Sequence, residues 1–291
     1  MEIIKQNYIR ESNEDSDWHV IVDPLPQGHL TYHKESLLAA EEIFSLKDGQ
    51  LYLMYSGGLD SEYVLSVFLD LKIDIVPVII RLSPGYNDHD VEYAFRYCQN
   101  KKLNPLVVDI DFDHFVKTGQ ILDTALSMRC CVYHYSVTAD VISRLDGTVL
   151  MGDGEPYIQF NSQTKTWNVV RYQYDFSMIN FYRKFNIRGT PDFLVYRPEM
   201  MISFLKTPRV RELAENKHPG KLGSNSSKYI IYNTDNDYNL LPRPKYTGYE
   251  KIESSAIFQE PIFKEFDRLK SVWGGIDYTD YYKFLNNVCK Q

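Results

Sequence analysis

Short apolar segments alternate with segments of helical periodicity between residues 51 and 155, and no other feature restricts the fold as much. The apolar runs predict strands over 51–55, 75–82, 106–110 and 148–151. Between them, helices are predicted over 60–71 and 88–102, and a long helical region over 116–143 is expected to be broken once. Strands that alternate with helices are typical of a parallel sheet with helices on both faces. We therefore predict an α/β fold whose ligands bind at the carboxyl ends of the strands.

The segments on either side of this core have weaker patterns. Residues 1–50 are predicted to be a lead-in that includes a helix over 35–46, and the core itself extends over 51–160. Residues 161–291 are predicted to form an irregular, mostly helical C-terminal part, with helices over 175–185 and 198–205. Within it, residues 217–239 are rich in Gly, Ser, Asn and Asp, which predicts an exposed, mobile loop.

The composition favours a small-molecule substrate over a nucleic acid. A formal net charge of −7 over 291 residues argues against extensive, sequence-independent binding of nucleic acid, because such binding requires Lys and Arg to neutralise the phosphates. The four cysteines, Cys98, Cys130, Cys131 and Cys289, lack the spacing of a zinc site. The start of the chain does not resemble a signal peptide, and no apolar run reaches the roughly 18 residues of a membrane span. We therefore expect a cytoplasmic protein with free thiols and no membrane partner.

The turn Ser56-Gly57-Gly58-Leu59-Asp60-Ser61 has the features of a phosphate cradle. It leads from a predicted strand directly into a helix, so backbone N–H groups and the positive end of the helix dipole face a ligand above it. Adjacent glycines permit a close approach to an anion, the serines add hydroxyl donors, and Asp60 can hold Mg²⁺. Because the turn lacks the lysine of a Walker P-loop, cleavage of ATP at the α-phosphate fits better than transfer of the γ-phosphate.

This turn resembles the S-G-G-x-D-S loop of the PP-loop ATP pyrophosphatase superfamily, whose fold is of the HUP or adenine nucleotide alpha-hydrolase type. The superfamily includes asparagine, NAD and GMP synthetases and several tRNA-modifying enzymes. The resemblance implies that ATP and Mg²⁺ are the cofactors, that a carboxylate or carbonyl oxygen is adenylated, and that a nitrogen or sulfur nucleophile then displaces AMP. It also implies nucleotide contacts from Ser56, Gly57, Gly58, Leu59, Asp60 and Ser61 and, near the adenine, from Ile80 and Arg81 on the second strand.

A second turn, Met151-Gly152-Asp153-Gly154-Glu155, resembles the acidic turn that asparagine synthetases place opposite their PP-loop. The match is partial, because Pro156-Tyr157 stands where that family has an acidic pair. The resemblance implies a nucleotide contact from Gly152, catalytic roles for Asp60 and Asp153, and a Mg²⁺ site formed by Asp60, Asp153 and Glu155. One or two carboxylates facing a triphosphate are what Mg²⁺ requires.

Two further pairs of residues carry charged or reactive side chains. Arg243 and Lys245 follow the predicted loop and are candidate catalytic cations that would neutralise departing pyrophosphate. Cys130 and Cys131 suggest sulfur transfer, but buried thiols are common in protein cores, and we favour a place in the core.

The nearest resemblance is to the synthetase domain of asparagine synthetase, which implies that a small carboxylate is adenylated and then amidated. The chain begins Met1-Glu2, with no cysteine at position 2 and no glutaminase domain, so ammonia is expected to come free or from a separate amidotransferase. Two alternatives are an enzyme that modifies tRNA or a deazaguanine-type base, and a nucleotide-binding protein without turnover. The sequence leaves the acceptor, the nitrogen or sulfur donor and the oligomeric state open.

Overall fold

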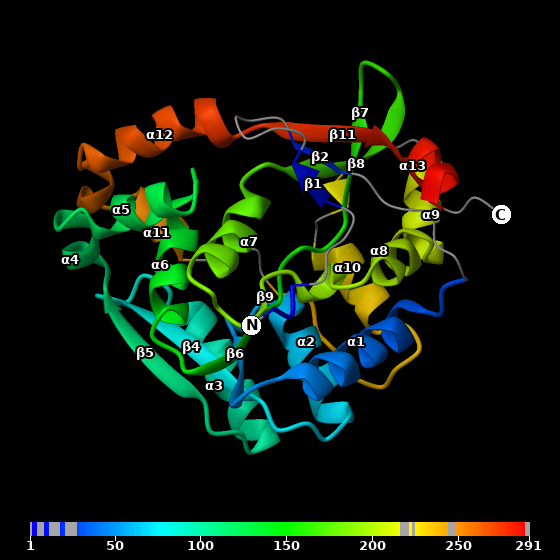
Figure 1. Ribbon diagram of the computed structural model, residues 1–291, viewed down its shortest axis with the longest axis horizontal. Helices are drawn as coiled ribbons and strands as arrows, with labels where there is room; N and C mark the ends of the chain where they lie inside the picture. Colours follow the sequence, from blue (N-terminus) through cyan, green and yellow to red (C-terminus); the bar gives the residue numbers. More distant parts are fainter. Residues whose placement is uncertain are drawn as a thin grey trace.

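A computed structural model describes residues 2–4, 9–11, 18–20, 28–215, 221–222, 225–243 and 248–288 (Figure 1). At its centre lies a parallel sheet with the strand order β5-β4-β3-β6-β9. The strands are β3 (Gln50–Met54), β4 (Val76–Ser83), β5 (Leu106–Asp111), β6 (Gly147–Met151) and β9 (Gly189–Thr190). The chain moves outward from β3 to β5 and then returns to the other side of β3 at β6, as in doubly wound α/β folds. The predicted fold class is confirmed.

Helices cover both faces of this sheet because alternate residues of each strand point to opposite sides. Leu51 and Leu53 of β3 pack into one apolar cluster, whereas Tyr52 and Met54 pack into another. The first cluster includes residues of α1 (Tyr32–Leu46), α2 (Leu59–Asp70) and α3 (Asp88–Lys101). The second includes residues of α4 (Phe112–Lys117), α5 (Gln120–Ser127), α6 (Tyr133–Ile142) and α7 (Asp175–Lys184).

The helical region predicted over 116–143 is divided more than expected. It begins earlier, at Phe112, because the side chain of Asp111 accepts a hydrogen bond from the backbone N–H of His114 and caps α4. It is interrupted twice: Gly119, with a φ of +79°, separates α4 from α5, and Arg129, with a φ of +54°, follows α5. A single break was predicted, so that detail is wrong.

The C-terminal part adds an antiparallel sheet that the sequence does not predict. Its order is β10-β7-β8-β11, formed by β7 (Tyr157–Asn161), β8 (Thr166–Tyr172), β10 (Lys221–Leu222) and β11 (Ile276–Asp280). The predicted helices over 175–185 and 198–205 correspond to α7 and α8 (Pro198–Leu205). The other elements are α9 (Pro208–Glu215), α10 (Asn225–Tyr232), α11 (Tyr249–Glu253), α12 (Ile262–Trp273), α13 (Tyr281–Val288), the 3-10 turns η1 (Phe193–Val195) and η2 (Ala256–Gln259), and the N-terminal pair β1 (Ile9–Glu11) and β2 (Trp18–Val20).

Residues 225–232 form the helix α10 where the sequence predicts a loop, so the loop prediction is wrong for this stretch. The helix is fixed by burial, since Ile231 and Tyr232 are at most 2% exposed. The ring of Tyr232 stacks on Tyr63 of α2, with ring centroids 4.4 Å apart. Residues 217–220 and 223–224 of the predicted loop lie outside the described residues.

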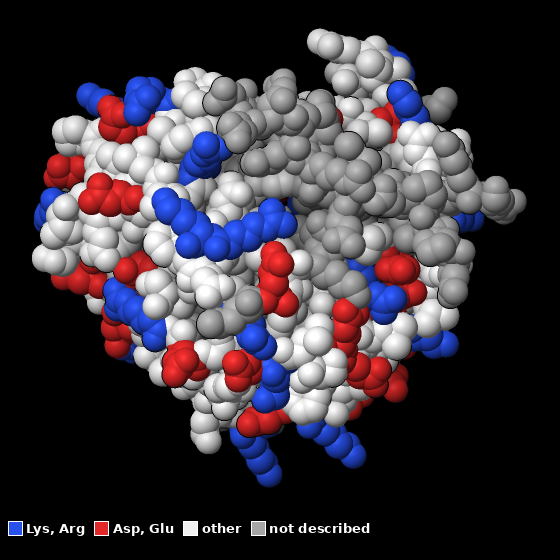
Figure 2. All heavy atoms as spheres, in the orientation of Figure 1, with Lys and Arg blue, Asp and Glu red and all other residues white. Residues whose placement is uncertain are grey.

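The charged side chains on the face shown in Figure 2 are mixed in sign. Lys and Arg form one short group near the centre of this face and are otherwise interspersed with Asp and Glu. Arg96 pairs with Glu92 within α3, and Arg144, just after α6, pairs with Asp140. The described part of this face therefore has no continuous basic stripe of the kind that binds nucleic-acid backbones. Among the described residues, no helix has both the length and the apolar character of a membrane span.

The turn that follows β6 lies directly against the first turn of α2. A Cβ atom on Gly152 would lie 2.8 Å from the Cα atom of Ser61 and 3.0 Å from its backbone nitrogen. Because both neighbours are backbone atoms, they cannot rotate out of the way. Gly152 therefore sets the short distance between the turn over 56–61 and the acidic turn over 151–155.

We predict that Gly152→Ala lowers the free energy of unfolding by about 1–3 kcal/mol, the usual cost of overpacking. The added methyl group must push α2 and β6 apart. Chemical denaturation measures the effect. Gly28→Ala is the matched control, because nothing lies within 4 Å of a Cβ atom there. Equal stability of the two variants would contradict the prediction.

Candidate functional site

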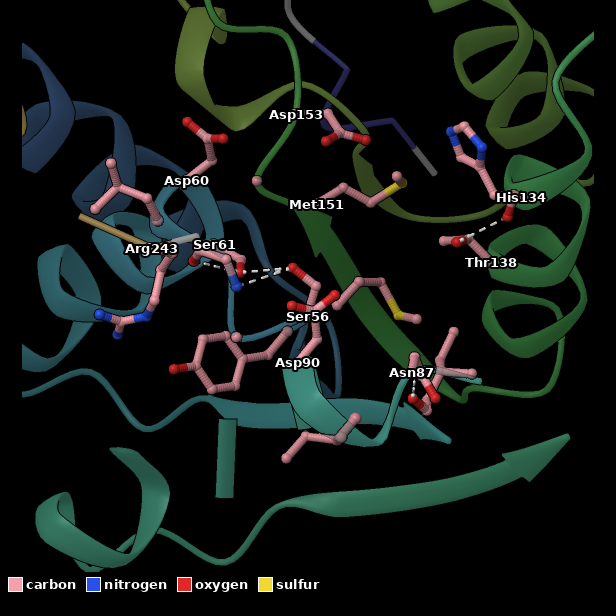
Figure 3. A pocket seen from close by; sticks show the side chains of 18 of the residues that line it. Ser56, Asp60, Ser61, Asn87, Asp90, His134, Thr138, Met151, Asp153 and Arg243 are labelled. Carbon is pink, nitrogen blue, oxygen red and sulfur yellow. Dashed lines mark hydrogen bonds between the residues drawn. The ribbon is translucent and has the colours of Figure 1, made fainter. Parts of the chain in front are cut away.

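A pocket of about 510 Å³ opens at the carboxyl ends of β3, β4 and β6, which is the edge predicted to bind ligands (Figure 3). This volume is typical of small-molecule sites. Residues 54–61 and 151–153 line it from the sheet, and α6 contributes His134, Tyr135 and Thr138. The C-terminal part contributes Lys228, Arg243 and Tyr249. The two turns predicted to form the site are therefore brought together in one pocket.

The turn over 56–61 is shaped to present donors to the pocket. Gly57 has a φ of +81°, and a Cβ atom on it would lie 2.6 Å from the backbone oxygen of Asp90, so this position requires glycine. The hydroxyl groups of Ser56 and Ser61 are 3.2 Å apart and share a hydrogen bond, and the N–H of Gly58 donates to Ser56 Oγ (Figure 3). Gly58 is the N-cap of α2, whose first N–H groups have no partner inside the helix. The arrangement suits an anion.

A lysine that was not predicted to be a site residue contacts this turn. Lys228 of α10 is only 6% exposed, and its Nζ atom donates to Oδ2 of Asp60 at 2.9 Å and to Oδ1 at 3.1 Å. The same ammonium group donates to Oε1 of Glu155. Tyr232, one helical turn further along α10, donates its hydroxyl to Oδ1 of Asp60 at 2.6 Å. Lys228 thus bridges the two turns of the pocket.

The charge states of this group follow from burial and from its close contacts. Burial alone would lower the pKa of Lys228, but the carboxylates of Asp60 and Glu155 outweigh it and raise that pKa. Burial also raises the pKa of Glu155, although Lys228 opposes this shift. The direct contacts favour a charged Lys228, because removing its proton would leave two partly buried carboxylates without a cation.

Arg243 lies in the pocket, as predicted, and Lys245 lies outside the described residues. The guanidinium of Arg243 donates to Oε2 of the buried Glu62 of α2, and it lies 5.0 Å from the ring centroid of Tyr93. Glu62 also accepts a hydrogen bond from the hydroxyl of Tyr55 at 3.3 Å. These contacts hold Arg243 beside the amino-terminal half of α2, close to the turn over 56–61.

Asp153 occupies a different part of the pocket from the lysine bridge. The backbone oxygen of Asp153 accepts a hydrogen bond from the N–H of Leu194, and Gly152 forms a bridge with Asp192. Burial, followed by the nearby carboxylates of Glu155 and Asp192, raises the pKa of Asp153 well above its ordinary value. Burial also lowers the pKa of His134 to about 4, so this imidazole is neutral.

The predicted Mg²⁺ site over Asp60, Asp153 and Glu155 is not assembled as expected. Within the described chain, no group of three or more His, Cys, Asp or Glu side chains is placed to hold a metal ion. Asp60 and Glu155 do converge, but on Lys228. Their oxygen atoms fit a Mg²⁺ ion that arrives with a triphosphate, because that ion commonly uses only one or two carboxylates together with phosphate oxygens.

The two residues predicted beside the adenine differ in position. Ile80 lines the pocket together with Val78, Ile79 and Leu82. Of these, Val78, Ile80 and Leu82 lie on one face of β4, because residues two apart on a strand share a face. Arg81 points elsewhere: its Nε atom donates to Oδ1 of Asp109 on β5 at 2.6 Å, and both side chains are about half exposed. The prediction of a nucleotide contact from the Arg81 side chain is therefore not supported by its position.

The amide side chain of Asn87 is part of the wall near Ile80. It accepts a hydrogen bond from the N–H of Leu82 and donates to the backbone oxygen of Ile80, each at 2.8 Å. These bonds satisfy backbone groups of β4 beyond Val78, where its pairing with β3 ends. The sequence offers a weak indication of this role, since Asn commonly bonds to nearby backbone in turns.

Cys130 and Cys131 lie in the core, as favoured from the sequence. Cys130 donates through its sulfur to the backbone oxygen of Val132, and Cys131 to that of Trp273. Burial raises the pKa of Cys130 to about 12, so its thiol keeps its proton. Neither cysteine lines the pocket.

The chain matches no known protein family and no curated protein. Among solved structures, it is similar to a predicted subunit of tRNA methyltransferase from Methanocaldococcus jannaschii, with 12% identity and a TM-score of 0.32 over 65% of this chain and 90% of that chain. It is also similar to an NH3-dependent NAD synthetase from Campylobacter jejuni in complex with the nitrate ion, with 12% identity and a TM-score of 0.35 over 82% of this chain and 92% of that chain. At these TM-scores, neither likeness bears on function.

We predict that Asp90→Asn stabilises the protein at neutral pH and not in acid. Burial raises the pKa of Asp90 from 3.8 to about 6, so the folded state holds this proton more tightly than the unfolded state. The resulting stability is present below about pH 4 and is lost as the pH rises through about 6. Urea unfolding at about pH 7.5 should therefore show a gain of up to about 3 kcal/mol, which is absent at about pH 4.

Asp88→Asn, at an exposed position in the same turn of α3, is the control for this measurement. A gain from Asp90→Asn that is equal at both pH values would show that ionisation of Asp90 is not its cause.

Proposed function

We propose that this protein is a PP-loop ATP pyrophosphatase, which cleaves ATP between its α and β phosphates and transfers AMP to an acceptor. The observation that carries the proposal is the convergence of three features in one pocket. These are the complete turn over 56–61 at the start of α2, a buried lysine facing that turn, and a second cation, Arg243, beside it. A site of this composition is suited to bind a triphosphate and to stabilise the pyrophosphate that leaves.

The phosphates are held by neutral donors and by the two cations. The hydroxyl groups of Ser56 and Ser61 and the first N–H groups of α2 donate hydrogen bonds to them. Asp60 lies among these donors and would repel a phosphate if its charge were not compensated. Lys228 supplies that compensation, and Asp60 and Glu155 are the residues that would hold Mg²⁺. When bound, Mg²⁺ neutralises the phosphate oxygens.

The adenine is proposed to lie against β4. Val78, Ile80 and Leu82 present apolar side chains to the pocket, and Met54 and Met151 lie at the ends of β3 and β6. An apolar wall with a few polar groups is typical of nucleotide and cofactor sites. Nucleotide contacts from Leu59 and Gly152 are also proposed, since both residues line the pocket.

The reaction would proceed in two steps. An oxygen of the acceptor forms a bond to the α-phosphorus atom, while the bond to the bridging oxygen breaks and pyrophosphate leaves with the electron pair. Lys228 and Arg243 neutralise the charge that develops on pyrophosphate. Ammonia, free or from a separate amidotransferase, then attacks the acyl carbon, AMP leaves, and the new nitrogen loses a proton.

A small carboxylate is the proposed acceptor, as in asparagine synthetases. An acyl-adenylate must be protected from water, which favours an enclosed pocket over an open surface. The net charge of −7 and the mixed charges on the face in Figure 2 also support a small substrate over tRNA.

We predict that incubation with α-labelled ATP, Mg²⁺ and the acceptor yields AMP and pyrophosphate, and that Ser56→Ala or Asp60→Asn removes this activity. The reason is that both residues lie where the phosphates would bind. Labelled products are separated by chromatography. Formation of ADP and phosphate by the unaltered protein would overturn the proposed class, and stimulation by bulk tRNA without response to any carboxylate would favour a nucleic-acid substrate.

We also predict that Lys228→Met lowers the rate of AMP formation by about 10²–10³, the usual effect of removing one electrostatic contact to a developing charge. Single-turnover kinetics with saturating ATP isolates this effect from binding. Lys165→Met, on the exposed β7–β8 turn, is the control and should leave the rate unchanged. A Lys228→Met protein that remains folded by circular dichroism and keeps its full rate would exclude this role for Lys228.

A further inference from the structure

The first turn of α3 connects the two parts of the pocket that the proposed function assigns to ATP. Asn87 is the N-cap of this helix, and its side chain donates a hydrogen bond to the backbone oxygen of Ile80 on β4. At the other end of the turn, the backbone oxygen of Asp90 would lie only 2.6 Å from a Cβ atom on Gly57. Residues 87–90 therefore extend from the proposed adenine wall to the proposed phosphate turn.

The ribose of a bound nucleotide would lie over the same segment. In ATP the ribose joins the adenine to the α-phosphate, so it occupies the space between the groups that bind those two parts. Asp90 lines the pocket, and in the view of Figure 3 it lies beneath Ser56, between Arg243 and Asn87. The side chain of Asp90 is 26% exposed, so its carboxyl group is accessible to a ligand in the pocket.

The charge of Asp90 is maintained in this wall at a cost to stability. The helix dipole ordinarily stabilises the charged form of an acidic residue in the first turn of a helix. Burial nevertheless raises the pKa of Asp90 to about 6, and the nearby His89 offsets this shift only in part. Asp88 is an exposed acid in the same turn and interacts with the helix dipole without that cost. A charge kept in a pocket against its own stability is typical of a group that binds a ligand.

From this arrangement we infer that Asp90 binds the ribose of ATP, with its carboxylate accepting hydrogen bonds from the 2′- and 3′-hydroxyl groups. The inference rests on the proposed function and deepens it, because it assigns the selection of ribonucleotides over deoxyribonucleotides to one residue of α3. A carboxylate has only acceptor oxygens, and a ribose presents two adjacent hydroxyl donors, so the two groups match in number and in role. Carboxylates bind ribose hydroxyl groups in this way in dinucleotide-binding α/β folds.

The test compares ATP with 2′-deoxy-ATP and 3′-deoxy-ATP. Calorimetry measures the binding of each nucleotide to the purified protein with Mg²⁺ and without an acceptor. At least one deoxynucleotide is expected to bind about tenfold or more weakly than ATP, as for the loss of a hydrogen bond to a charged group. In Asp90→Ala the difference should fall to about twofold or less, the usual scatter between independent effects, because ATP then loses the contact that the deoxynucleotide already lacks.

Asp90→Asn is a second variant, which keeps the shape of the side chain and should reduce the preference for ATP because its amide oxygen is uncharged. Thermal unfolding checks that both variants are folded. Asp88→Ala, at the exposed position in the same turn, is the matched control and should keep the full preference. The inference is overturned if both deoxynucleotides bind as tightly as ATP, or if either Asp90 variant keeps the full preference.

Release of AMP from labelled ATP, measured in parallel with the acceptor, separates this inference from the proposed function. A preference for ATP that depends on Asp90, without AMP formation, would support the ribose contact and contradict the proposed reaction. Equal binding of the three nucleotides, together with AMP formation, would support the reaction and contradict the ribose contact. A protein that binds none of the three nucleotides would contradict both.

Discussion

The ammonium group of Lys228 is the contact on which the rest of the site depends. It joins the first turn of α2, through Asp60, to the turn after β6, through Glu155, and it belongs to a helix far along the chain. An ion pair buried in this way adds little net stability, because the desolvation of each charge offsets the attraction. Its effect is positional: Lys228 holds the carboxylates of Asp60 and Glu155 on one ammonium group, so the two turns are kept close together.

The same contact would change partners if a triphosphate and Mg²⁺ bound as proposed. A triphosphate offers Lys228 oxygen atoms with more charge than the two carboxylates carry, and Mg²⁺ offers those carboxylates a replacement cation. Binding of ATP with its metal would therefore exchange partners around Lys228 without leaving any charge uncompensated. Tyr232, bonded to Asp60 and stacked on Tyr63, anchors α10 to α2 during such an exchange.

Sequence patterns were sufficient for those parts of the fold that local rules determine. The strand before Ser56, the helix after it and the alternation of strands and helices depend on residues close in sequence, and the structure has all of them. Lys228 depends on Asp60, 168 residues away, and lies in a stretch whose Asn and Ser residues read as a loop. A lysine becomes recognisable as a site residue only when its burial is known. The second sheet was missed for a similar reason, since its edge strand β11 pairs with β8 only after a long intervening segment.

Position on a strand explains why neighbouring predictions had different outcomes. Ile80 and Arg81 are adjacent, yet only Ile80 faces the pocket, because side chains alternate across a sheet and Arg81 meets Asp109 on the next strand. The acidic turn divides in the same way: Glu155 faces Lys228, whereas Asp153 faces the aromatic side of the pocket. A turn that reads as a single metal site in the sequence thus places its two acidic side chains among different neighbours. Gly152 leaves no room for a Cβ atom beside Ser61, so this one close backbone contact positions both side chains relative to the first turn of α2.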